Sequence, residues 1–231
     1  MIRAAVVLAF LALFIPPATV VGVGLTLLTG NPRSLYVLAR LCVNIGLFLG
    51  GIRLEVTGLE HVGPAGNTVF MANHLSLLDP PVLLKALGVD FKVLVKQELF
   101  KTPFLGTAML RAGLIPVDRG NREQARRSIA AAVDSLRKGN DFLVFPEGTR
   151  SRTGELGEFK KGVFLAAMEA ESRIVPVVVG GTGDLLPKGR FALRPGTVTV
   201  ELLPAVAARP GDDRDRLMDD VRGRIAAAQG R

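Results

Sequence analysis

The stretch NTVFMANHLSLLDPP, residues 67–81, joins two kinds of sequence across a short turn. Its first half, TVFMA, is a continuous apolar run, which is typical of a strand buried on both faces of a sheet. Its second half ends in Asp79, Pro80 and Pro81. An aspartate directly before a proline is a frequent helix start, so we expect Asp79 as the N-cap and Pro80 at the first helical position. The stretch therefore predicts a buried strand, a turn and a helix.

The same alternation of apolar runs and helical patterns continues through the rest of the chain. Helices are expected after Asp79, at 121–139 with Asn121 as N-cap, after Lys160, and at 212–229. The predicted strands are, in chain order, IRLEVTG (52–58), NTVFMA (67–72), FKVLV (91–95), GLIPV (113–117), DFLVF (141–145), RIVPVVV (173–179) and TVTVELL (197–203). The pattern indicates an α/β fold in which a mixed, largely buried central sheet is flanked by helices.

The N-terminal fifty residues have the character of a membrane anchor. No side chain from Ala4 to Thr29 is charged, a length that could cross a bilayer, but Pro16-Pro17 is expected to divide this run into two short halves. A second apolar stretch from Leu35 to Gly51 carries Arg40, which is costly in hydrocarbon unless it faces protein or reaches the interface. We therefore expect two membrane-embedded or interfacial helices. A cleaved signal peptide is the alternative, although no A-x-A cleavage site follows.

The composition narrows the class of partner. The 231 residues include 29 Lys and Arg against 21 Asp and Glu, and 48% are hydrophobic, so we expect contact with lipid and with an anionic partner such as a phosphate or an anionic membrane surface. Nucleic acid is disfavoured, because the chain has no Trp and a single Tyr for stacking on bases. The only cysteine, Cys42, excludes a disulfide framework. The predicted organisation is an anchor at 1–51 and an α/β domain at 52–231.

His74 and Asp79 are the first candidates for chemistry. Five residues apart, they would not meet on one helix face, but the predicted turn lets the carboxylate fold back onto an imidazole at the carboxyl end of a strand. Such a pair can take a proton from a substrate hydroxyl, although both residues can also serve only the structure. His61 is the only other histidine, so a metal site lacks ligands. Ser76 is poorly placed to act as a nucleophile.

Two arginine-bearing segments follow predicted strands. GLIPVDRG, residues 113–120, brings Arg119 beyond the end of one strand, and LVFPEGTRS, residues 143–151, brings Arg150 beyond the end of another. Guanidinium groups bind phosphate through paired hydrogen bonds, so the two could hold a phosphorylated substrate beside His74. Each arginine taken separately could also be a surface residue after a turn.

Together these segments resemble the conserved blocks of the glycerolipid acyltransferases. NHLSLLD matches the His-x4-Asp motif of that family, GLIPVDRG is similar to the second block, FPEGTRS to the third and IVPVVV to the fourth. All four occur in the family's order, between about Arg53 and Glu201. A short chain with a hydrophobic N-terminus is most similar to the bacterial members that acylate lysophosphatidic acid.

The resemblance implies an enzyme of phospholipid biosynthesis. It implies acyl transfer from acyl-CoA or acyl-carrier protein to lysophosphatidic acid, giving phosphatidic acid, without a metal or other cofactor, at the cytoplasmic face of a bacterial inner membrane. It makes His74 the general base and Asp79 the group that orients and charge-stabilises it. The implied substrate-binding residues are Lys96, Arg119, Glu147, Gly148, Thr149 and Arg150. Glycerol-3-phosphate, another lysophospholipid or a lyso-aminolipid remain possible acceptors, and a non-catalytic peripheral membrane-binding protein remains the alternative class.

Overall fold

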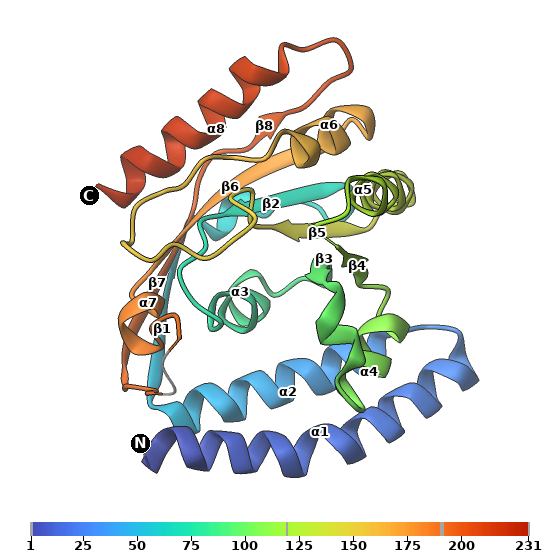
Figure 1. Cartoon of the computed structure of the whole chain (residues 1–231), viewed down its shortest axis with the longest axis vertical. Helices are drawn as coiled ribbons and strands as arrows, with labels where there is room; N and C mark the ends of the chain where they lie inside the picture. The colour runs from blue at the N-terminus through green and yellow to red at the C-terminus, as the bar shows by residue number, and fades with distance from the viewer. Residues whose placement is uncertain (1, 119, 190–191, 231) are drawn as a thin grey trace.

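The computed structural model describes residues 2–118, 120–189 and 192–230. Two long helices, α1 (Ile2–Thr29) and α2 (Arg33–Gly50), lie side by side at one end of the molecule, and an α/β unit is built on them (Figure 1). The remaining helices are α3 (Asp79–Leu87), α4 (Leu105–Arg111), α5 (Arg122–Arg137), α6 (Lys161–Glu169), α7 (Thr182–Leu185) and α8 (Arg214–Gln229), with short 3-10 turns at Leu59–His61 and Gln97–Lys101.

The sheet has the order β1-β7-β6-β2-β5-β3-β4, and β8 pairs with β6 beside this path. Neighbouring strands are parallel except where β6 meets β7 and β8, so the sheet is mixed, as predicted. The strands are β1 (Ile52–Thr57), β2 (Thr68–Ala72), β3 (Phe91–Lys96), β4 (Ile115–Val117), β5 (Asp141–Val144), β6 (Arg173–Gly180), β7 (Gly196–Leu202) and β8 (Val206–Ala207). All seven predicted strands are present, whereas β8, α4 and α7 were not predicted.

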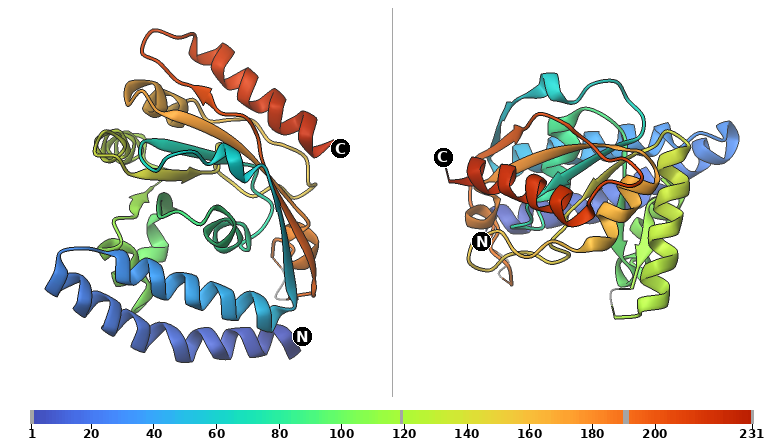
Figure 2. Two further views of the ribbon diagram at one scale, coloured as in Figure 1. Left: turned by 180° about the vertical axis from the view of Figure 1, so that it is seen from behind. Right: turned by 90° about the horizontal axis from the view of Figure 1, so that it is seen from above.

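Both faces of the central strands are buried, which explains their continuous apolar sequences. On β5, Phe142 belongs to a core shared with α5, α6 and α8, while its neighbour Leu143 belongs to a second core shared with α3 and α2. Successive side chains of a strand point to opposite faces, so each apolar residue of the run has a core to enter. Seen from behind, α3 lies between the central strands and α2 (Figure 2).

Helix α1 corrects the expectation that Pro16-Pro17 divides the first apolar run. The helix continues through both prolines and bends along its length (Figure 1). Each proline removes one backbone hydrogen bond, but α1 packs against α2 and α4. Ala4 and Val7 before the prolines and Val23 after them pack against buried core residues. The approach to α2 is close at Gly22, where an added Cβ would lie 2.6 Å from a methyl carbon of Leu35.

Helix α2 is packed into the α/β unit. Leu47 is 4% exposed and belongs to the same core as Leu143 of β5 and the buried side chains of α3. The Tyr36 hydroxyl donates to the Phe91 carbonyl oxygen at 3.0 Å, and Arg40 faces protein through an ion pair with Asp90 at 2.6 Å. The packing is therefore continuous across residues 51 and 52, where the character of the sequence changes.

Truncation of Leu47 tests this packing. We expect Leu47→Ala to lower the free energy of unfolding by about 2–5 kcal/mol, because it leaves a cavity in a filled core. Leu41→Ala, on the same helix at an exposed position, is the matched control and should cost far less. Denaturant unfolding of the detergent-solubilised protein measures both, and equal losses would show that α2 does not share the core.

Candidate active site

His74, Asp79 and the Glu147–Arg150 segment come together beyond the carboxyl ends of parallel strands. Strands β2, β5, β3 and β4 are parallel, so their carboxyl ends point the same way. His74 follows β2 by two residues and Glu147 follows β5 by three. Because β2 and β5 are adjacent in the sheet, the two segments that follow them meet. Open α/β sheets bind ligands beyond the carboxyl ends of their strands.

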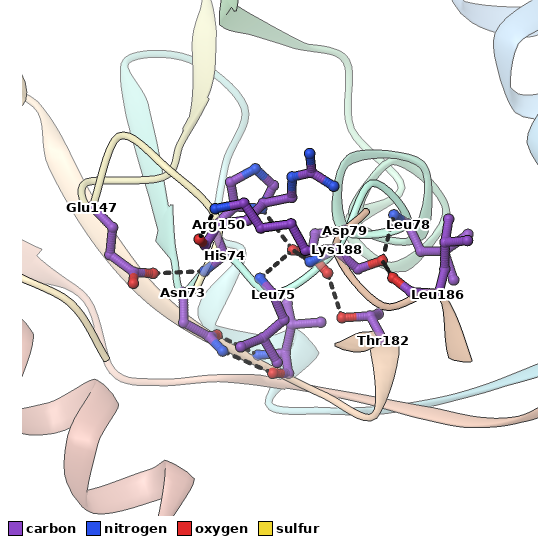
Figure 3. A network of polar contacts seen from close by, with 12 residues as sticks. Asn73, His74, Leu75, Leu78, Asp79, Glu147, Arg150, Thr182, Leu186 and Lys188 are labelled. Carbon is purple, nitrogen blue, oxygen red and sulfur yellow. Dashed lines mark hydrogen bonds and ion pairs between the residues drawn. The ribbon is translucent and has the colours of Figure 1, made fainter. Parts of the chain in front are cut away.

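The carboxylate of Asp79 folds back onto the imidazole of His74, which confirms the predicted geometry. Asp79 Oδ2 lies 2.7 Å from His74 Nδ1 and also accepts the backbone N–H groups of Leu75 and Ser76 at 2.7 and 2.8 Å (Figure 3). The Thr182 hydroxyl donates to Oδ1. Asp79 is completely buried, so its carboxylate depends on these donors for the solvation that it has lost.

The prediction that Asp79 is the N-cap of α3 was wrong. Helix α3 has Leu78 as its N-cap and Asp79 as its first residue, and no side chain caps it. A capping oxygen normally accepts the N–H of the second or third helical residue. With Asp79 as the cap these would be Pro81, which has no N–H group, and Val82, whose N–H donates instead to the carbonyl oxygen of Leu78 at 3.0 Å. The carboxylate instead turns away from α3 toward the preceding turn and His74.

The main chain of His74 is held by the segment that follows β5. Its N–H donates to Glu147 Oε1 at 2.7 Å, and its carbonyl accepts the N–H of Ser151 at 2.7 Å. Its ring stacks on Phe145, with 4.0 Å between ring centroids. The second oxygen of Glu147 accepts the N–H of Gly157 at 2.9 Å, and Glu147 is 5% exposed. In this structure Glu147 thus positions His74, a contact that the implied role in substrate binding did not include.

The other implied substrate-binding residues lie at different depths. Gly148 adopts φ +71° in a tight turn and Thr149 is exposed. Arg150 is half-buried, and its carbonyl oxygen accepts a hydrogen bond from the ammonium group of Lys188 at 2.8 Å. Lys96, at the end of β3, is exposed and paired with the nearby Glu98 at 3.0 Å.

Arg119 lies outside the described residues. Val117, two residues earlier in the sequence, ends β4, the edge strand beside β3. The structure therefore brings together His74, Asp79 and the Glu147–Arg150 segment.

Sequence reasoning missed four residues. Three of them connect the His74 segment to β6 and the segment that follows it, and the fourth, Lys188, donates to the carbonyl oxygen of Arg150. Asn73 exchanges two hydrogen bonds with the main chain of Val179, at 2.9 and 2.7 Å, and Ser76 Oγ donates to the Leu186 carbonyl at 2.7 Å. Thr182 and Lys188 complete the set. Their position in the sequence could have indicated two of them, since Thr182 and Lys188 follow the carboxyl end of the predicted strand 173–179.

An apolar cavity of about 460 Å³ opens beside the site. Phe145, Glu147 and Gly148 line it next to His74, and Val93 and Ile129 line it farther away. It can take an alkyl chain or a thioester arm. Within the residues that the structure describes, no group of three or more His, Cys, Asp or Glu side chains is placed to hold a metal ion.

The arrangement suits proton transfer. With Nδ1–H donated to Asp79, the neutral imidazole presents the lone pair of Nε2, and the side chain of His74 remains 16% exposed. A substrate hydroxyl at Nε2 could lose its proton there while the buried carboxylate stabilises the imidazolium that forms.

Comparison with known proteins identifies the family of the chain. A family model described as Acyltransferase matches residues 53–180. The 1-acyl-sn-glycerol-3-phosphate acyltransferase of Borreliella burgdorferi is 32% identical over 156 residues, which are 68% of this chain and 62% of that protein. The chloroplastic 1-acyl-sn-glycerol-3-phosphate acyltransferase LPAT1 of Arabidopsis thaliana is 34% identical over 192 residues, covering 82% of this chain and 52% of that protein. The chain thus spans less than two thirds of the length of these relatives.

A solved structure shares the fold. The crystal structure of the 1-acyl-sn-glycerophosphate acyltransferase PlsC from Thermotoga maritima matches with a TM-score of 0.88 at 23% identity, covering 99% of this chain and 94% of that chain. The match includes the two N-terminal helices, since it extends over nearly the whole chain.

Proposed function

Because the chain belongs to the acyltransferase family, whose model spans residues 53–180, we propose that it transfers a fatty acyl group from an acyl thioester to lysophosphatidic acid, giving phosphatidic acid. The observation that carries the proposal is the contact of His74 with a completely buried Asp79 at an open sheet edge. The names of the curated relatives in Borreliella and Arabidopsis support the choice of acceptor.

His74 acts as the general base in this proposal. Nε2 takes the proton of the free glycerol hydroxyl as its oxygen forms a bond to the thioester carbonyl carbon, which gives a tetrahedral oxyanion. The oxyanion collapses, the carbon–sulfur bond breaks, and the thiolate leaves with the proton from the imidazolium. Asp79 orients the ring through Nδ1 and stabilises its positive charge. Every step uses groups of the chain and its two substrates, with acyl-CoA or acyl-carrier protein as the donor.

The positions of Arg150 and the cavity support two substrate sites. Arg150 belongs to the segment that holds the main chain of His74, so a phosphate bound there brings the glycerol hydroxyl toward Nε2. Arg119 is proposed as its companion, on the family resemblance. The apolar cavity beside Phe145 fits the hydrocarbon of one substrate, because removal of each methylene from water contributes about 0.8 kcal/mol.

We place the protein at the cytoplasmic face of a bacterial inner membrane. Both N-terminal helices are long and apolar enough to cross a bilayer by length and composition. The packing of α2 between α1 and α3, with Arg40 paired to Asp90, favours helices that lie along the membrane surface. The surface of α1 supports this, since its exposed large apolar side chains are Ile2, Val6, Leu8, Leu13, Val20, Val21, Leu25, Leu27 and Leu28.

One assay tests the proposal against its alternatives. The purified full-length protein is incubated with lysophosphatidic acid and either acyl-CoA or acyl-carrier protein carrying the same chain, and product is identified by mass. Parallel reactions offer glycerol-3-phosphate, another lysophospholipid and a lyso-aminolipid. Phosphatidic acid should be the preferred product. Faster acylation of another acceptor would reassign the substrate, and consumption of no thioester with any acceptor would favour the membrane-binding protein.

Replacement of Arg150 should weaken binding of the acceptor. We expect Arg150→Ala to raise KM for lysophosphatidic acid by about 10- to 100-fold with a smaller effect on kcat, because charge-assisted hydrogen bonds contribute about 1.5–3 kcal/mol. Arg150→Lys should restore only part, since it loses the paired geometry. Arg137→Ala, at an exposed arginine of α5, is the control. An equal loss with a phosphate-free monoacylglycerol acceptor would show that Arg150 has a structural role.

A further inference from the structure

Three side-chain contacts join the segment that carries the catalytic pair to β6 and the segment that follows it. Asn73 bonds to the main chain of Val179, Asp79 to the hydroxyl of Thr182, and Ser76 to the carbonyl of Leu186 (Figure 3). The polar members Asn73, Ser76, Asp79 and Thr182 are each at most 1% exposed. Buried polar groups of this kind fix a single arrangement when each finds its partner.

The two oxygens of the Asp79 carboxylate differ in their support. Oδ2 receives three donors, namely the imidazole of His74 and the N–H groups of Leu75 and Ser76. Of the described residues, only Thr182 donates to Oδ1. Loss of that hydroxyl therefore leaves a completely buried carboxylate oxygen without a donor, and it removes one of the contacts that set the rotation of the carboxylate.

The backbone places Thr182 with little freedom. Gly181 precedes it at φ +83°, a conformation that other residues rarely adopt. An added Cβ at Gly181 would lie 2.6 Å from the carbonyl oxygen of Thr197 on β7, so the chain passes close to that strand. Thr182 then begins α7, and its hydroxyl meets Asp79 across the end of the sheet.

We propose that Thr182 is a positioning residue for acyl transfer. Its hydroxyl holds the Asp79 carboxylate so that Oδ2 stays on Nδ1–H of His74 and Nε2 remains the nitrogen that accepts the substrate proton. The inference rests on the proposed function, in which His74 is the base. It extends the catalytic pair to a third side chain that lies 103 residues after Asp79 in the sequence.

Kinetics of two Thr182 variants test the role of the hydroxyl. Valine keeps the shape of threonine and removes the hydroxyl, whereas serine keeps the hydroxyl. We expect Thr182→Val to lower kcat by about 10- to 100-fold, by analogy with the loss found when the hydrogen-bond partner of a metal-binding histidine is removed. KM for lysophosphatidic acid should change little. Thr182→Ser should recover most of the wild-type kcat. Where valine yields no folded protein, Thr182→Ala takes its place.

Ser172→Ala is the matched control. Ser172 lies directly before β6, at the end opposite to Thr182, and its buried hydroxyl donates to Asn67 Oδ1 at 2.6 Å. Its loss removes a buried hydroxyl hydrogen bond away from the sheet edge that carries His74. We expect it to lower stability while kcat stays at the wild-type value.

Nitrogen-15 NMR of the imidazole gives a readout that does not depend on activity. The chain has only two histidines, so the His74 signals are assigned by comparison with a His61→Gln sample. In the wild type we expect Nδ1 to be protonated, with a downfield Nδ1–H resonance from the contact with Asp79. In Thr182→Val that resonance should move upfield or exchange faster, whereas His61 in the same sample and His74 in Ser172→Ala should be unchanged.

The two readouts separate failure of the inference from failure of the proposed function. A Thr182→Val protein with wild-type kcat and an unchanged His74 resonance would overturn the inference. Equal kcat losses in Thr182→Ser and Thr182→Val would do the same, because the hydroxyl would not be the group that matters. If the wild type acylates no acceptor while the His74 resonance still responds to valine and not to serine, the positioning contact stands and the proposed reaction fails.

Discussion

Replacement of His74 by alanine is expected to abolish acyl transfer and to leave the protein folded. The imidazole contacts Asp79 and the ring of Phe145, whereas the hydrogen bonds that hold this segment to Glu147 and Ser151 come from the main chain and survive the change. We expect kcat to fall by about 10⁴-fold, the upper end of what a positioned acid–base group contributes. Product formation from lysophosphatidic acid at saturating thioester measures the loss, and circular dichroism checks the fold.

The chain supplies its own control for this result. His61 is the only other histidine, and it lies in a 3-10 turn with its side chain 31% exposed. His61→Ala should keep wild-type turnover. Turnover near the wild-type value in the His74 variant would mean that another group accepts the proton, and the mechanism would have to be abandoned.

Asp79→Asn should also lower turnover strongly, and the structure indicates the cause. The N–H groups of Leu75 and Ser76 both point at Oδ2, so an asparagine placed here keeps its oxygen on that side and its NH₂ toward Thr182. The imidazole then keeps the tautomer with Nδ1–H, and only the negative charge is lost. We expect kcat to fall by about 10²- to 10³-fold, because a charge-assisted hydrogen bond in a buried site is replaced by a neutral one.

A comparison of two variants separates charge from orientation. In the serine-protease triad the same change costs about 10⁴-fold because the amide leaves the imidazole in the wrong tautomer. Asp79→Ala removes both the charge and the oxygen that accepts three N–H groups, so it should lose more activity and stability than Asp79→Asn. Equal turnover in the two variants would show that the charge alone matters, and full activity of the asparagine variant would show that Asp79 has only a structural role.

The features that the sequence predicted well are those encoded locally. A run such as DFLV predicts a strand because both faces of β5 meet apolar cores. The return of Asp79 onto His74 was also local, since it needs only a turn between residues five apart. The prediction that Asp79 caps α3 failed for a local reason too, because Pro81 has no N–H group and the N–H of Val82 donates to the carbonyl oxygen of Leu78. The prediction that the prolines divide α1 failed for a non-local reason. The helices that pack against α1 cannot be inferred from the sequence of α1 itself.

The rest of the site depends on which strands become neighbours. Thr182 and Asn73 gain their roles because β6 lies beside β2, although the two strands are separated by about a hundred residues. Glu147 reaches the main chain of His74 because β5 lies on the other side of β2. A single sequence does not give the strand order, so it could indicate these residues by type but not by contact.

The same strand order determines when the contacts around His74 can form as the chain is made. His74 and Asp79 emerge early, but Glu147 joins His74 across 73 residues and Thr182 joins Asp79 across 103. The hydrogen bond from Ser76 to the Leu186 carbonyl oxygen spans 110 residues. Contacts at such separation form late in folding, because their loops must first be closed at a cost in entropy. A growing chain on the ribosome therefore lacks part of the network around His74 until residue 186 is free, long after the apolar N-terminal helices have emerged. The apolar N-terminal helices are therefore made first, and the contacts around His74 are completed last.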